Sequence, residues 1–224
     1  GDSELVEELV AFCKQEGHHT AQHIKFDRMN AQMGIDVEGC RARYTRLLDR
    51  VRSNVDPMEM LAVTTALEHF TAGLAGQIFE RPELSAGADP KVAALWFWHA
   101  AEEAEHKATC FDIYRKLGGG EFTRLSVMPV AWFLIIGLSM VNTFVLLAKD
   151  KKLSNVADIA GGLWYLFGWR GFFSGMIPSF VAYFSPRFHP WKEDNAHRIA
   201  GWFADNARYV QNIEEPRASI PAAE

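Results

Sequence analysis

The chain has 224 residues, of which 49% are hydrophobic and 23% charged, so it is long enough for one folded domain with a full core. This composition excludes intrinsic disorder. The 23 basic and 28 acidic side chains give a formal charge of −5, and Lys and Arg form no block, so we expect no nucleic-acid partner. The 3 cysteines are widely separated, which argues against a disulfide scaffold and for a reducing, cytoplasmic compartment.

Helical periodicity dominates the first part of the chain, residues 1–120, which we assign to one helical bundle. Helices are predicted over 3–33, 40–54, 57–79 and 91–117. An Asp-Pro pair marks the start of each of the last two helices, where Asp suits the N-cap and Pro suits the first turn. Glycines follow the first and the last of the four, as expected at helix ends.

The second part of the chain, residues 121–191, is predicted to be an apolar helical segment that packs on the bundle or on a membrane. Residues 127–148 carry no charge and are about as many as a bilayer-spanning helix needs. This stretch can be a membrane span, an interfacial helix or a buried core helix. Residues 192–224 are expected to form a C-terminal helix and a tail. No segment alternates with a period of two, so the predicted fold class is all-α.

We favour a peripheral contact with the inner membrane among these three interpretations. Tryptophan, tyrosine and phenylalanine are frequent in this part of the chain and suit the headgroup layer. Lysines at 149, 151 and 152 suit anionic lipids.

Glutamate and histidine share one face of the first predicted helix. At about 100° per residue, Glu16, His19 and His23 lie within an arc of about 60°. His18 points to the opposite side, where we expect it to be solvated.

A second group lies on the last of the four predicted helices, where His99, Glu103 and His106 again share an arc of about 60°. Glu102 lies at the edge of that face. Glu68 stands among small and apolar residues on the preceding helix.

These side chains predict a dinuclear metal site. A Glu-x-x-His pair on one helix face brings a carboxylate and an imidazole to one ion, and bundles combine such helices with bridging carboxylates. Burying so many ionisable groups unpaired would cost several kcal/mol each, and a metal pair removes this cost. The predicted ligands are Glu16, His19, His23, Glu68, His99, Glu103 and His106.

The number of donors favours two ions with room for a reactant. The predicted ligands offer about ten donor atoms, whereas two six-coordinate ions take about twelve. We expect two iron ions, with manganese and zinc as alternatives, and Glu102 as the acceptor that fixes the tautomer of a ligand imidazole. The competing interpretation is a solvated stripe in which glutamates pair with Lys107 and the histidines are partly exposed.

Three segments resemble the bacterial family called predicted metal-dependent hydrolases. They are residues 15–23 (QEGHHTAQH), 68–72 (EHFTA) and 98–107 (WHAAEEAEHK), and residues 188–191 (FHPW) are similar to a late motif of the same family. The resemblance covers most of the chain. The family name implies hydrolysis by a metal-bound hydroxide.

The spacing His99-x3-Glu103-x2-His106 also resembles the last ligand helix of ferritin-like di-iron N-oxygenases of the p-aminobenzoate type. That resemblance implies a carboxylate-bridged di-iron centre that activates dioxygen. Members of the hydrolase family usually carry a further upstream helix with a Glu near paired aromatic residues, which nothing here matches. We therefore expect either a missing N-terminal segment or a site with one carboxylate fewer.

The sequence thus predicts a ferritin-like helical bundle with an additional apolar helical half, acting as an enzyme that activates dioxygen at two iron ions. The expected partners are an apolar or aromatic small molecule, dioxygen, an electron donor, a membrane surface and a second copy in a homodimer. The first alternative is a metal-dependent hydrolase with zinc or manganese. The second is a non-catalytic metal-binding helical module.

Overall fold

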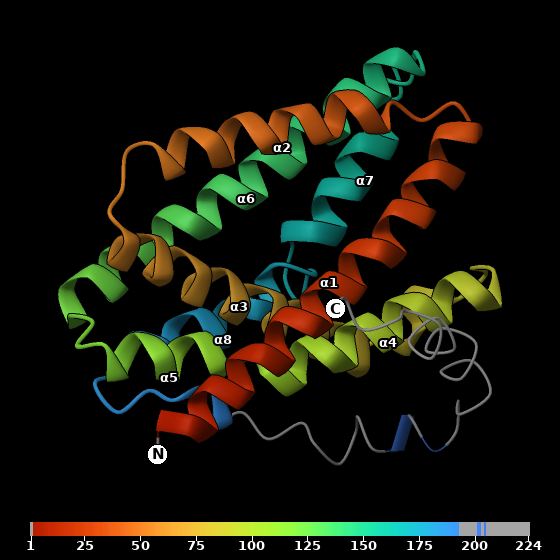
Figure 1. The fold of residues 1–224 in the computed structure, drawn as a ribbon. Coiled ribbons are helices and arrows are strands. Elements are labelled where there is room, and N and C mark those ends of the chain that lie inside the picture. Colours follow the sequence, from red (N-terminus) through yellow and green to blue (C-terminus); the bar gives the residue numbers. More distant parts are fainter. Residues whose placement is uncertain (1, 193–200, 203, 205–224) are drawn as a thin grey trace.

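A computed structural model describes residues 2–192 together with 201, 202 and 204, and within these residues the fold is all-α, as predicted (Figure 1). The elements in chain order are α1 (Asp2–Gln32), α2 (Val37–Arg52), α3 (Pro57–Glu80), the short 3₁₀ helix η1 (Pro82–Ser85), α4 (Pro90–His106), α5 (Thr109–Lys116), α6 (Glu121–Lys149), α7 (Val156–Phe167), η2 (Ser174–Met176), α8 (Ile177–Ala182) and η3 (Pro190–Lys192).

Helix boundaries follow the local signals in the sequence. Asp56 caps α3 by accepting hydrogen bonds from its first turn, and Glu59 completes a capping box by accepting from the Asp56 backbone N–H. Asp89 caps α4 in the same way. Gly34 and Gly118, which follow α1 and α5, have φ values of 86° and 81°, a conformation that side chains disfavour.

The prediction of one continuous helix over 91–117 is wrong. The segment 91–117 is two helices, α4 and α5, separated by a turn at Lys107 and Ala108. No glycine or proline marks this break. Lys107 is buried there, with its Nζ 5.1 Å from the ring centroid of Trp191, so a contact between distant segments accompanies the turn. The predicted C-terminal helix falls almost wholly outside the described residues.

The central element is α3, which packs against α4, α5 and α6. Alanines at 62, 66, 72 and 75 on α3 and at 100, 101 and 104 on α4 are buried, and such small side chains allow helix axes to approach closely. The helix α1 crosses α4 and α5, and α2 runs alongside α6, where Tyr44 and Ser139 hydroxyls are 2.8 Å apart (Figure 1). The candidate site lies where α1 meets α4.

The long helix α6 is not a buried core helix, which excludes one of the three interpretations of residues 127–148. Its most apolar 18-residue window has a mean hydropathy of 2.2, yet 17% of that window is buried. By length and composition α6 could cross a membrane. One face packs on α3 through Met128 and Trp132, whereas Phe133 on the other face is 73% exposed.

Replacing Met128 by alanine should lower the free energy of unfolding by about 2–5 kcal/mol, because the side chain is fully buried between α6 and α3. Phe133→Ala, on the exposed face of the same helix, should change it by less than about 0.5 kcal/mol in lipid-free buffer. Chemical denaturation measures both values. Equal losses would contradict the packing of α6 described above.

Candidate metal centre

Three side chains from two helices form a compact group of metal donors. They are His19 on α1 and His99 and Glu103 on α4, with one donor atom from each within 4.8 Å of the others. Glu103 Oε1 lies 3.6 Å from His19 Nδ1 and 3.4 Å from His99 Nε2. His19 and Glu103 are buried and His99 is half-buried.

The distances and the donor types fit a metal ion. Ligand atoms about 2.1 Å from a tetrahedral ion lie about 3.4 Å from one another, which matches the separations around Glu103 Oε1. Glu16 adds a second carboxylate, with its Oε1 3.5 Å from His19 Nδ1. Its side chain is 39% exposed, so this carboxylate lies where the group meets solvent.

Glu102 contacts the far side of the His19 ring. Its Oε2 is 2.8 Å from His19 Nε2, and both side chains are almost fully buried. A carboxylate at Nε2 holds the ring proton there and leaves Nδ1, the nitrogen nearest Glu103, for an ion. Glu102 is the residue that sequence analysis selects for this second layer.

The carboxylates determine the protonation of His19. Burial alone lowers the pKa of His19, but Glu102, Glu16 and Glu103 outweigh it and raise that pKa from 6.5 to about 9. Burial and the neighbouring charge of His19 lower the pKa of His23. The metal-free site therefore carries its positive charge on His19 near neutral pH.

The remaining predicted ligands lie in different places. The ring of His23 borders the group, with its centroid 4.8 Å from that of His99. Glu68 is buried on α3, outside the three-donor group found among the described side chains. Its charge adds to burial in raising the pKa of the Cys110 thiol to about 12. His106 ends α4, and its side chain is outside the described part of the chain.

One expectation from helical angles is wrong, and so is part of the interpretation that competes with a metal site. His18 is half-buried rather than solvated, because Trp98 of α4 is broad enough to contact both His18 and His19, at centroid distances of 5.1 and 5.3 Å. The solvated-stripe interpretation fails for Glu102 and Glu103, since both are buried against His19.

The other histidines of the quoted motifs support the fold. His69 is buried on α3, where its Nε2 lies 3.0 Å from the backbone oxygen of Ser179 on α8. His189 of the FHPW segment lies 3.0 Å from Asp112 of α5, and Phe188 packs on the His69 ring at 5.0 Å. These contacts hold the end of residues 121–191, the apolar half of the chain, against α3 and α5.

Comparison with known families agrees with this donor chemistry. A family model described as predicted metal-dependent hydrolase matches residues 1–194, and the chain therefore belongs to that family. No curated protein and no solved structure gives a significant match.

Membership of this family overturns the prediction of a dioxygen-activating di-iron enzyme and favours the hydrolase, its stated alternative. The cause of the error is chemical. Imidazole and carboxylate at helical spacing determine where an ion sits, and the same ligands serve both electron transfer to oxygen and activation of water. Ligand spacing alone does not distinguish these reactions.

Zinc affinity should rise with pH. Metal-free His19 is protonated below about pH 9, and an ion needs the neutral ring, so each bound ion displaces a proton. The apparent affinity should therefore increase by about tenfold per pH unit from about pH 7 towards 9 and then level off. Calorimetry in buffers of different ionisation enthalpy counts the released proton. His18→Gln is the matched control and should keep this slope. A pH-independent affinity in the wild type would refute the assignment of His19 as a metal ligand.

Proposed function

We propose that the protein is a metal-dependent hydrolase whose ion is held by His19, His99 and Glu103. The observation that carries the proposal is the donor set itself, two imidazoles and one carboxylate within 4.8 Å. Catalytic zinc sites use this set and leave a further position for water or substrate. Zinc is therefore the favoured ion and manganese the alternative. A second ion that uses Glu68 and His106 stays a prediction from the sequence.

The chain's own side chains divide the remaining work. A bound ion supplies a water molecule of lowered pKa and polarises the scissile carbonyl. Glu16, half-exposed beside His19 Nδ1, is placed to take the proton of the attacking water and to pass it to the leaving group. Glu102 holds the proton on His19 Nε2. Trp98, fully buried against His19, keeps solvent from the back of the site.

Substitutions at three glutamates distinguish a metal ligand, a general base and a residue that has neither role. Glu103→Gln should lose the ion and hydrolytic activity together, because it removes the carboxylate shared by both imidazoles. Glu16→Gln should keep the ion and lower kcat by about 10²–10⁴-fold, the usual contribution of a general base. Glu105→Gln, on the exposed side of α4, is the matched control and should retain both.

The measurement pairs metal analysis with hydrolysis of chromogenic esters and amides by zinc-loaded and manganese-loaded protein. Rates should be equal with and without dioxygen. Loss of the ion in Glu16→Gln would make Glu16 a ligand instead of the base. Full activity of Glu103→Gln, or of chelator-treated protein, would refute the proposal.

We further propose that the apolar half attaches the protein to the cytoplasmic face of the inner membrane. On α6 the exposed side chains Val130, Phe133 and Val141 form an apolar outer face, where a helix in water would carry polar residues. Trp164 on α7 is 69% exposed. Such area on a monomer marks an interaction surface, and aromatic rings suit the lipid headgroup layer. Lysines at 151 and 152, exposed beyond the end of α6, suit anionic headgroups.

Vesicle binding tests this attachment. The wild type should co-sediment with vesicles that contain anionic phospholipid. Phe133→Ala with Trp164→Ala should weaken binding by about tenfold or more, because the lipid would no longer bury these two exposed rings. Met33→Ala, at an exposed apolar position outside the apolar half, should have no effect. A stable homodimer in plain buffer that ignores vesicles would assign the face to a second copy of the chain.

A further inference from the structure

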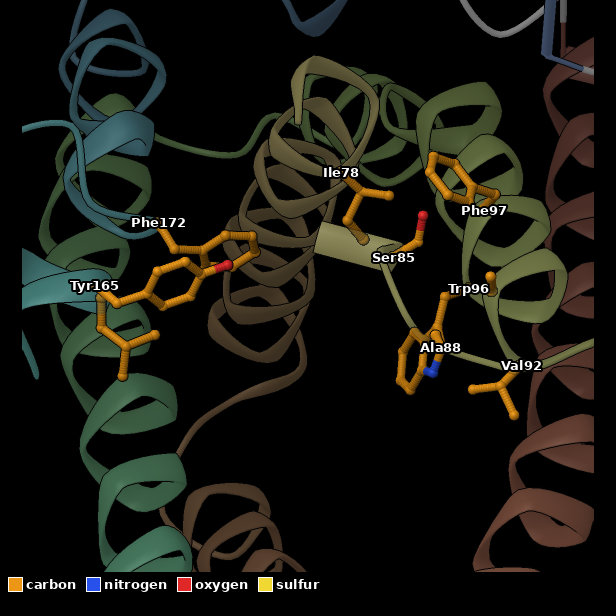
Figure 2. Close-up of a pocket in the computed structure, with 10 residues that line it drawn as sticks. Ile78, Ser85, Ala88, Val92, Trp96, Phe97, Tyr165 and Phe172 are labelled. Atoms are coloured by element: carbon orange, nitrogen blue, oxygen red, sulfur yellow. The ribbon is translucent and has the colours of Figure 1, made fainter. Parts of the chain in front are cut away.

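An apolar pocket with a volume of about 350 Å³ lies between α3, α4 and α7 (Figure 2). Its lining includes Ile78 of α3, Val92 and Trp96 of α4, and Tyr165 of α7. The volume falls within the range of about 300–1,000 Å³ that is usual for small-molecule pockets. Figure 2 shows the side chains of α4 and α7 on opposite sides of this space.

The lining residues define the chemistry of the occupant. None of them is charged, and the polar side-chain groups among them are the hydroxyls of Ser85 and Tyr165 and the indole N–H of Trp96. A charged or strongly hydrated group would lose its water here without gaining a partner. A hydrocarbon chain instead gains about 0.8 kcal/mol for each methylene that it buries.

The pocket adjoins the proposed metal centre along one helix. Val92, Trp96, His99 and Glu103 follow one another at spacings of four, three and four residues, so they share one face of α4. Trp96 is the wall common to both, because it lines the pocket and its ring centroid is 6.0 Å from that of His99 and 5.7 Å from that of His23. At 1.5 Å per residue, Trp96 precedes His99 by about 4.5 Å along the axis.

We propose that this pocket binds the acyl chain of the substrate, an ester or amide of a medium-length fatty acid, with the scissile carbonyl beside His99 in the middle of α4. The proposal rests on the proposed hydrolase function and names its substrate class. Hydrolysis of an ester forms a bond between the water oxygen and the acyl carbon and breaks the bond to the alcohol oxygen, which leaves with the water's proton. Tyr165 and Leu166 of α7 form the opposite wall, so a chain can enter from the apolar half of the molecule.

The test uses a probe whose binding does not depend on catalysis. Dodecanoate should bind the metal-free full-length protein, as measured by calorimetry, and butanoate should bind far more weakly. Ala93→Phe places a ring inside the pocket and should weaken dodecanoate binding by about tenfold or more. Ala88→Phe, in the exposed loop before α4, is a second filling variant that leaves helix packing untouched. Ala160→Phe adds the same ring to the exposed side of α7 and is the matched control.

Hydrolysis provides the second measurement. In Ala93→Phe the KM for the p-nitrophenyl ester of dodecanoate should rise by about tenfold, with kcat and metal content unchanged, while the acetate ester is unaffected. Faster cleavage of a dodecanoyl phospholipid in vesicles than of the soluble ester would identify a lipid source, and the reverse a soluble one. Dodecanoate binding that is equal in the wild type and both filling variants would overturn the proposal. Binding that follows the pocket without hydrolysis of any ester would refute the hydrolase function and leave the pocket assigned.

Discussion

The structure depends on one electrostatic constraint, the burial of two adjacent carboxylates against a single imidazole. Glu102 and Glu103 are neighbours on α4, and both contact His19 of α1, one at each ring nitrogen. Buried charges are expensive unless they are neutralised at close range. The protonated ring of His19 supplies one positive charge between the two carboxylates, and a bound cation would supply more. The interface between α1 and α4 therefore gathers donor atoms that could hold a metal ion.

Close helix packing makes this constraint geometrically attainable. Buried alanines at 100, 101 and 104 surround the two glutamates on α4, and α3 contributes alanines opposite them. Small side chains let the helices approach closely, so that a glutamate on one helix can reach an imidazole on its neighbour. The same helix carries Trp96 and Trp98, whose rings contact the histidines of α1 and limit water near them. Charged side chains and packed aromatic rings thus lie close to one another along α4.

Much of the candidate site could be predicted from helical geometry alone. Glu16 and His19 share an arc of α1, and His99 and Glu103 share an arc of α4, because 3.6 residues per turn determine these angles. Which arcs face each other depends on packing between distant segments. The burial of His18 against Trp98 and the turn at Lys107 both arise from such contacts, and no local residue signals them. The spacing of the ligands could not predict the class of reaction either, since His and Glu ligands serve several chemistries.

Trp96 constrains how this protein can evolve, because its ring has two structural roles. It forms part of the wall of the apolar pocket and packs edge-on against His99 and His23. A smaller residue at this position would enlarge the pocket and, in the same step, remove the ring that steadies two imidazoles. Under the proposed function, selection for bulkier substrates and selection for tight metal retention would therefore act on this side chain in opposite directions. Substrate range in this lineage is expected to evolve through the α7 wall, where mutations are free of that conflict.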